Sequence, residues 1–228
     1  MSGGGHPRRR VGREVVPLSA GAGAAVLAEL LEPCRECVFW ERGPAPVSPS
    51  AQRAAQDKAA WVSHVESAWG SPGWVVRVDG VTAGQLFLAP APLAPRTLAF
   101  PTAPVSDDAL VLLSVRIDPR YAGQGLGRLL IQTAAQATLE RGHRAIEAFG
   151  TTRDERCLLP VGFLTAAGFR VVREHSAYPR VRLDLRTAVG WRGDVERALD
   201  RILAPVRRMG GRAPVGTANQ DAPDPSRG

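Results

Sequence analysis

The 228-residue sequence predicts an α/β fold in which helices flank a mixed central β-sheet. The apolar runs at 108–118 and 144–150 enclose a helical pattern, and this order predicts a right-handed parallel crossover. The run at 73–89 predicts an antiparallel hairpin before the crossover. Two further strand-like runs, 169–174 and 180–185, follow it and are expected to pair. Parallel and antiparallel pairs in one chain predict a mixed sheet.

The first part of the chain supplies a strand and two helices. Residues 13–18, "REVVPL", predict a short strand, and the Ala/Leu-rich residues 20–32 predict a helix that ends before a proline. Residues 50–68 predict an amphipathic helix, for which Ser48 or Ser50 is a suitable N-cap.

The hairpin and the later helices follow from turn residues and apolar spacing. Asp79-Gly80 is a pair that tolerates positive φ and therefore predicts the hairpin turn. A helix is expected over 125–141, with a small inner face that suits close packing on a sheet. Residues 159–167 predict a short helix, and 191–204 a last amphipathic one. The inner face of the 125–141 helix is formed by Leu126, Leu130, Ala134 and Ala137.

The ends of the chain differ in composition from its middle. Residues 1–10 predict a disordered arm, and residues 206–228 a disordered tail rich in Gly, Pro and Asp. Such segments bury too little apolar surface to offset the entropy of ordering. The folded domain is therefore expected over residues 11–205.

Charge and cysteine content limit the partners and the compartment. The net charge is +7, but the arginines are interleaved with acids, which argues against a nucleic-acid face despite the high pI. No apolar run approaches the roughly 20 residues of a membrane span. Three cysteines cannot form a closed set of disulfides, which favours a reducing, cytoplasmic location.

The stretch "RYAGQGLGRLL", residues 120–130, places three glycines between a strand and a helix. Backbone N–H groups of such a turn, together with the helix N-terminus, form an anion site. The stretch is not a P-loop, because Arg128 follows the last glycine where a lysine is needed. The spacing Gly123-x-Gly125-x-Gly127 also differs from that of a dinucleotide fingerprint.

The longer string "VRIDPRYAGQGLGRLLIQTAAQATLERGHRAIEAF" resembles the acetyl-CoA-binding core of the GCN5-related N-acetyltransferases (GNAT). The later "FLTAAGFRVV" resembles the second landmark of that family, a short helix that ends in Gly-Phe before a strand. The resemblance covers roughly residues 72–186. It implies a GNAT fold whose sheet is splayed at the central parallel strands, with acetyl-CoA as co-substrate.

The resemblance also implies a reaction and a cofactor site. An amine of a small molecule or a peptide would attack the thioester directly, and such chemistry depends mostly on positioning. The pyrophosphate would lie on the amides of residues 122–128, and the pantetheine arm would pair with residues 115–117. No membrane partner is implied, and assembly as a homodimer is left open. The implied cofactor-binding residues are Val115, Arg116, Ile117, Ala122, Gly123, Gln124, Gly125, Leu126, Gly127, Arg128 and Cys157.

The catalytic residues usual in that family are absent at the matching positions. Leu164 stands where the acid tyrosine is frequent, and Cys157 stands where many members have an asparagine. Direct transfer still needs a base for the amine and an acid for the thiolate. The candidates left for these roles are Glu147, Tyr178 and His175, of which Glu147 and Tyr178 are favoured. The alternatives are an edge-facing or salt-bridged Glu147, a packing Tyr178 and an exposed loop His175.

Two further interpretations remain open at this point. The missing tyrosine and glutamate also fit a catalytically degenerate module that binds acyl-CoA as a sensor or partner-binding protein. "CRECVFWE", residues 34–41, holds a Cys-x-x-Cys pair. A zinc site would need two more ligands, so a structural role is favoured, with Phe39 and Trp40 in the core or over a substrate cleft.

Overall fold

The computed structural model describes residues 12–19, 27–43 and 50–185. These residues lie within one compact unit that ends at Arg186. The two expected tails and the expected helix at 191–204 lie outside the described residues.

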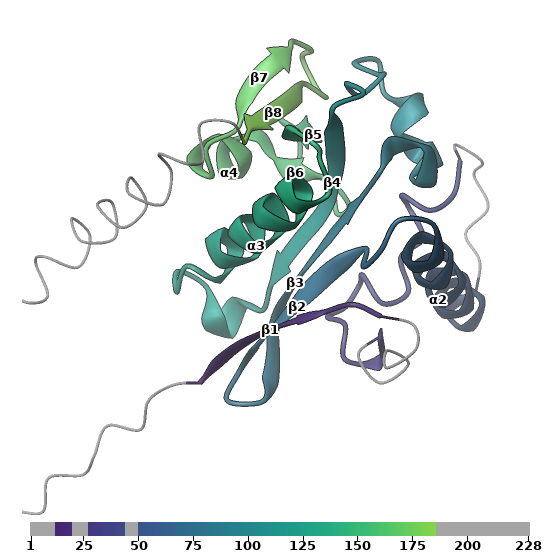
Figure 1. Ribbon diagram of the computed structural model, residues 1–228, viewed down its shortest axis with the longest axis vertical. Helices are drawn as coiled ribbons and strands as arrows, with labels where there is room; N and C mark the ends of the chain where they lie inside the picture. Colours follow the sequence, from purple (N-terminus) through teal and green to yellow (C-terminus); the bar gives the residue numbers. More distant parts are fainter. Residues whose placement is uncertain (1–11, 20–26, 44–49, 186–228) are drawn as a thin grey trace, which may run out of the picture. The chain divides into compact units, whose positions relative to one another are not determined.

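Among the described residues, eight strands form one mixed sheet in the order β1-β2-β3-β4-β5-β8-β7, with β6 beside β5 (Figure 1). Neighbours are antiparallel except for β4–β5 and β5–β6, which are parallel. The strands are β1 (Arg13–Pro17), β2 (Gly73–Val78), β3 (Val81–Ala89), β4 (Ala109–Ile117), β5 (Ala145–Thr151), β6 (Leu159–Pro160), β7 (Arg170–Arg173) and β8 (Arg180–Asp184).

Helices cover both faces of the sheet (Figure 1). On one face α3 (Leu126–Glu140) and α4 (Val161–Ala166) pack on a core that includes Leu86 and Leu110. On the other face α2 (Ala51–Ala68) and the segment 27–43 pack on a second core. Two short 3-10 helices, η1 (Ala91–Leu93) and η2 (Pro95–Ala99), lie between β3 and β4, and a third, η3 (Pro119–Tyr121), follows β4.

The central parallel strands separate along their length. The β4–β5 ladder joins only residues 109–111 to residues 145–147. Beyond it β4 continues to Ile117, still paired with β3 on its other side, while β5 pairs with β6 and β8. The backbone of residues 112–117 therefore presents an edge to β5 without ladder bonds, and the splay expected from the sequence is confirmed.

Most of the expected elements are confirmed, because local signals and packing agree. Ser50 caps α2 by accepting a hydrogen bond from the Arg53 amide. Asp79 and Gly80 have φ of 50° and 83° in the hairpin turn. The four expected inner-face residues of α3 are all buried. The sequence did not reveal β6 or the 3-10 helices of the Pro-rich connection.

The helix expected over 20–32 differs from the structure in its described part. Residues 27–28 are helical, but the chain turns from residue 29 onward. The Leu31 amide donates to the Gln85 side chain at 2.7 Å rather than to a helical carbonyl. A tertiary hydrogen bond therefore ends this helix earlier than the Ala/Leu pattern suggests.

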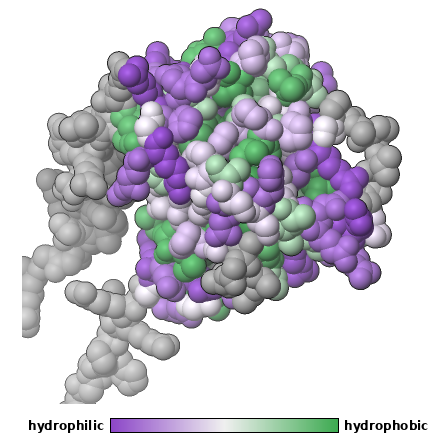
Figure 2. Space-filling model, turned by 45° about the vertical axis from the view of Figure 1, so that its right-hand side comes forward, coloured by the Kyte–Doolittle hydropathy of each residue, from purple (hydrophilic) through white to green (hydrophobic). Residues whose placement is uncertain are grey.

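The surface over α2 mixes polar and apolar residues, without one continuous apolar area (Figure 2). None of the helices in the described part of the chain is long and apolar enough to cross a membrane.

Candidate functional site

The turn between β4 and α3 holds a row of free backbone donors. Gly123 and Gly125 have φ of 73° and 77°, a backbone conformation that favours glycine. A Cβ at either position would meet nothing within 4 Å, so the space in front of the turn is open. Within the described chain, the amides of residues 123–128 donate no hydrogen bond to the backbone. The glycines thus serve both a sharp bend and an accessible surface of N–H groups.

The start of α3 adds to this anion site. Gly125 is the N-cap, and α3 runs for 15 residues, so its positive dipole end points at the turn. Leu126 and Leu130 are buried behind the turn and hold it in place. Phe163 lies near Gly127, where a Cβ would be 3.5 Å from its ring. The arrangement suits a diphosphate group.

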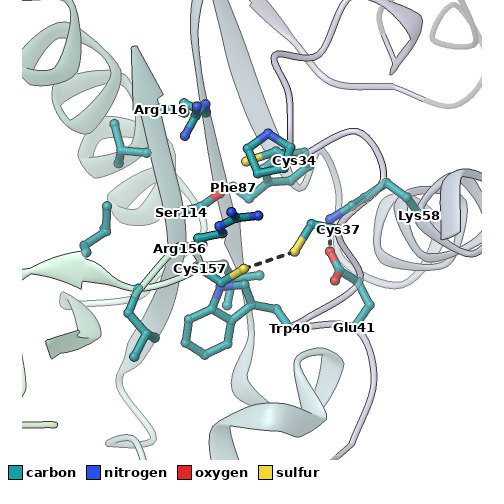
Figure 3. Close-up of a pocket in the computed structure, with 15 residues that line it drawn as sticks. Cys34, Cys37, Trp40, Glu41, Lys58, Phe87, Ser114, Arg116, Arg156 and Cys157 are labelled. Atoms are coloured by element: carbon teal, nitrogen blue, oxygen red, sulfur yellow. Dashed lines mark hydrogen bonds and ion pairs between the residues drawn. The ribbon is translucent and has the colours of Figure 1, made fainter. Parts of the chain in front are cut away.

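A pocket opens where β4 and β5 separate, on the face of the sheet that α2 covers (Figure 3). We call it the splay pocket. It is a concave site that is partly open to solvent. Its walls come from the 27–43 segment, α2, β3, β4 and the β5–β6 connection. The lining residues are Pro33, Cys34, Cys37, Trp40, Glu41, Lys58, Phe87, Leu113, Ser114, Val115, Arg116, Arg156, Cys157, Leu158 and Leu159.

An ion pair between Glu41 and Lys58 lies in the wall of the splay pocket. The side chains are only 5% and 7% exposed. Lys58 Nζ also lies 4.8 Å from the centre of the Phe87 ring, a favourable cation–π distance. Lys58 is the only lysine of the sequence, and the pair holds the Glu41 carboxylate in one place.

Two buried polar atoms in the same wall have no hydrogen-bond partner among the described residues. They are Glu41 Oε2, an acceptor, and Trp40 Nε1, a donor. Buried polar groups are normally satisfied, so an unpaired one in a native fold calls for an explanation. Trp40 itself is fixed by ring stacking on Phe100 and Phe149. A ligand that donates to Glu41 and accepts from Trp40 would satisfy both atoms.

The three cysteines of the sequence all line the splay pocket. Cys37 Sγ and Cys157 Sγ are 3.2 Å apart and share a hydrogen bond. The hydrogen bond with Cys157 lowers the pKa of Cys37 to about 6, and the same bond raises the pKa of Cys157. Burial raises the pKa of the Cys34 thiol.

The predicted cofactor residues are divided between the turn and the pocket. Val115, Arg116 and Cys157 line the splay pocket. Residues 122–128 form the turn beyond the end of β4, and Ile117 lies beside Gly127. The structure therefore places the turn, the open edge of β4 and the pocket in succession.

Glu147 lies in a buried charge cluster and does not line the splay pocket. Its side chain is fully buried and forms ion pairs with Arg180 at 2.6 Å and with Arg182 at 3.0 Å. It also accepts hydrogen bonds from the Ser106 hydroxyl and amide. This geometry favours the salt-bridged alternative, since both oxygens are engaged by protein groups.

Replacing Glu147 by alanine is expected to lower the free energy of unfolding by about 3–5 kcal/mol, because removal of one partner leaves buried charge uncompensated. The guanidinium most affected is that of Arg180, which is 9% exposed. Urea unfolding checks this. The exposed Glu14→Gln is the control and should change stability by no more than about 1 kcal/mol. Unchanged stability of Glu147→Ala, combined with lost catalysis, would instead favour a catalytic Glu147.

Tyr178 also lies away from the pocket lining. Its hydroxyl donates to Glu155 at 2.8 Å, and this hydrogen bond raises the pKa of Tyr178. Its ring packs edge-on against Phe100. Leu164, at the position of the missing tyrosine, is fully buried in the core beneath α3 and α4. The catalytic roles of Glu147 and Tyr178 stay predictions.

Sequence reasoning missed Glu41 and Lys58. They are separated by 17 positions and lie in different elements. One signal was present in the sequence: a single lysine in a chain whose other basic residues are arginine and histidine. A lysine on a mostly apolar helix face indicates a specific charged partner, but it does not say which residue that partner is.

Comparison with family models gives a match to the acetyltransferase (GNAT) family over residues 24–158. That range includes the 27–43 segment, α2, β4 and the glycine turn. A comparison with curated protein sequences finds no match.

Comparison with solved structures finds similar acetyltransferase chains at low sequence identity. The PaiA N-acetyltransferase of Thermoplasma acidophilum, in complex with coenzyme A, is 16% identical with a TM-score of 0.48, covering 76% of this chain and 99% of that one. An N-acetyltransferase of Staphylococcus aureus Mu50 is 14% identical with a TM-score of 0.49, at 76% and 99% coverage. YncA of Salmonella typhimurium, a putative acetyltransferase with acetyl-CoA, is 15% identical with a TM-score of 0.47, at 76% and 94% coverage.

Proposed function

Since the chain belongs to the GNAT acetyltransferase family, we propose that it transfers the acetyl group of acetyl-CoA to an amine by direct attack. The acceptor is an amine of a small molecule or of a peptide. Acetyl-CoA is the co-substrate, in keeping with the coenzyme A and acetyl-CoA complexes among the similar structures. We also propose a reducing, cytoplasmic compartment, because the three cysteines are free thiols.

Acetyl-CoA is held by the backbone in this proposal. The diphosphate accepts hydrogen bonds from the amides of residues 123–128, which have no other partner in the described backbone. The pantetheine amides pair with the open edge of β4 near residues 115–117, where no β5 ladder bonds form. Ala122 supplies no side-chain contact to the diphosphate, so the backbone donors carry this interaction.

The observation that carries the acceptor site is the unpartnered, buried Glu41 Oε2 in the splay pocket. A protonated amine donates to this oxygen, while Lys58 holds the other oxygen. The carboxylate takes one proton from the ammonium, and the neutral amine then attacks the thioester carbon. As the tetrahedral intermediate collapses, the carbon–sulfur bond breaks, and the second proton lost by the nitrogen goes to the departing coenzyme A thiolate. In this proposal Glu41 is the base for the amine, a role for which Glu147 was a candidate from the sequence.

The test is release of free coenzyme A thiol from acetyl-CoA with a panel of amines. The panel contains small polyamines, amino sugars, amino acids and peptides with a free N-terminus. We expect at least one class to raise thiol release above hydrolysis, with an acetylated amine as product by mass spectrometry.

A chain that binds coenzyme A by calorimetry but never raises thiol release with any amine would contradict the proposal. That outcome would favour the acyl-CoA-binding module. The observation that supports this second candidate function is the buried Leu164, which stands in place of the usual tyrosine.

A further inference from the structure

Two segments far apart in the sequence bring three thiols to one pocket. Cys34 and Cys37 come from the 27–43 segment, and Cys157 comes from the β5–β6 connection. Only 3.2 Å separates Cys37 Sγ from Cys157 Sγ, although 120 positions separate the residues. Figure 3 shows these two side chains directed at each other across the pocket.

The distance is suited to bond formation with little movement. A disulfide has its sulfurs about 2.05 Å apart, so each side chain needs to move only a fraction of the present separation. Both residues are half-buried rather than enclosed, so a small reagent can reach them. Among the described residues, no group of three His, Cys, Asp or Glu side chains could hold a metal ion.

The charges around Cys37 favour its reactive form. The hydrogen bond shared with Cys157 lowers the pKa of Cys37, the Phe39 amide also lowers it, and the Lys58 ammonium acts in the same direction. Burial and the Glu41 carboxylate act in the opposite direction and raise the pKa of Cys37. The net result is a thiolate near neutral pH, and the thiolate is the nucleophile in thiol–disulfide exchange.

We propose that Cys37 and Cys157 form a reversible disulfide that ties the 27–43 segment to the β5–β6 connection across the splay pocket. The oxidant is a low-molecular-weight disulfide. The Cys37 thiolate attacks one of its sulfurs, and the other half leaves as a thiol. Cys157 then loses its proton, attacks the Cys37 sulfur and displaces the second half. The reagent is reduced to two thiols, and the two protein thiols lose two electrons.

The disulfide closes the acceptor side of the site, a consequence that rests on the proposed function. Glu41 lies four positions after Cys37 on the same segment. Tying this segment across the pocket prevents the walls from separating around an amine. The amides of residues 123–128 do not line the pocket, whereas Val115, Arg116 and Cys157 do, so oxidation weakens coenzyme A binding only modestly while acetyl transfer stops.

The covalent step is tested on the full chain, reduced and then treated with oxidised glutathione at neutral pH. We expect a mass lower by two hydrogens without a glutathione adduct, a drop from three to one alkylatable cysteines, and a peptide that links Cys37 to Cys157. The Cys34→Ser variant is the matched control and should form the same disulfide. Cys37→Ser and Cys157→Ser should not. A stable glutathione adduct, or a link that includes Cys34, would overturn the proposal.

The pH dependence of alkylation gives a second measurement on the unsubstituted chain. The iodoacetamide reaction at Cys37, followed by peptide mass, should reach half its maximal rate near pH 6, since its pKa is lowered to about 6. Cys34, whose pKa is raised by burial, should react only at higher pH. Equal pH profiles for the two cysteines would count against the proposal.

The effect of the disulfide on function is tested by comparing the reduced and the oxidised protein. Calorimetry should show coenzyme A binding in both states, with a loss of affinity on oxidation far smaller than the loss of acetyl transfer, which should return with dithiothreitol. Oxidised protein with full transfer activity would contradict closure of the pocket. Failure of the reduced protein to acetylate any amine would contradict the proposed function instead, and the peptide map would still decide the disulfide.

Discussion

Replacing Glu41 by glutamine is expected to lower kcat for amine acetylation by about 10²–10⁴-fold, the usual contribution of a positioned general base. Glutamine keeps the shape of the side chain but cannot take the proton that the amine loses. Coenzyme A affinity should not change, because residues 122–128, which we propose to bind the diphosphate, lie on a separate segment that does not line the splay pocket. Steady-state kinetics and calorimetry, performed on the same preparation, test both statements.

The matched control for Glu41 is Glu36→Gln. Glu36 is an exposed carboxylate on the same segment, and its replacement should leave kcat within about 2-fold of the original value, as for most surface changes. Glu41→Gln also leaves the Lys58 ammonium without its partner, which by itself destabilises the fold. If that variant fails to fold, the double replacement Glu41→Gln with Lys58→Met removes both charges and tests the same role. A kcat similar to that of the original chain in either folded variant would contradict the assignment of Glu41.

Replacing Gly125 by glutamate is expected to weaken coenzyme A binding by about 100-fold or more. The loss of two hydrogen bonds to a charged group costs roughly 3–6 kcal/mol, and each 1.4 kcal/mol is a factor of ten in affinity. The added carboxylate lies at the N-cap of α3, where it would occupy the place of the diphosphate and repel it. Calorimetry measures the affinity, and circular dichroism confirms the fold.

Gly125→Ala separates charge from backbone strain. Alanine has the same unfavourable φ of 77° to adopt, at a cost of about 1–2 kcal/mol, but it adds no charge. A Cβ there meets no protein atom within 4 Å, so we expect a small loss of stability and a much smaller loss of affinity. Equal affinities for the glycine, alanine and glutamate forms would show that the diphosphate lies elsewhere.

The local features of the fold could be predicted because their physical causes lie within short stretches of sequence. Asp79-Gly80 permits the positive φ of a hairpin turn, and the glycines at 123 and 125 do the same before α3. The spacing of apolar residues in α3 places them on one buried face. These causes act over a few residues, so the sequence by itself determines most of the longer elements, the parallel crossover and the glycine turn before α3.

The candidate acceptor site could not be predicted, since it depends on how distant segments pack. Stacking of Trp40 on Phe100 and Phe149 fixes the 27–43 segment over the sheet. That packing brings Glu41 to Lys58 and Cys37 to Cys157. Neither the spacing of apolar residues nor local secondary-structure propensity encodes contacts between residues so far apart in the sequence.

Glu147 shows, within a single strand, the same difference between what the sequence predicts and what the tertiary structure decides. The sequence reveals a carboxylate in an apolar run, which is equally consistent with catalysis and with a buried ion pair. The register of β5 with β8 places Arg182 directly across from it, and Arg180 also reaches it. The sequence determined only that a charge lies within an apolar strand, and the tertiary structure decided that it is buried and what neutralises it, because the partners come from a strand more than 30 positions away.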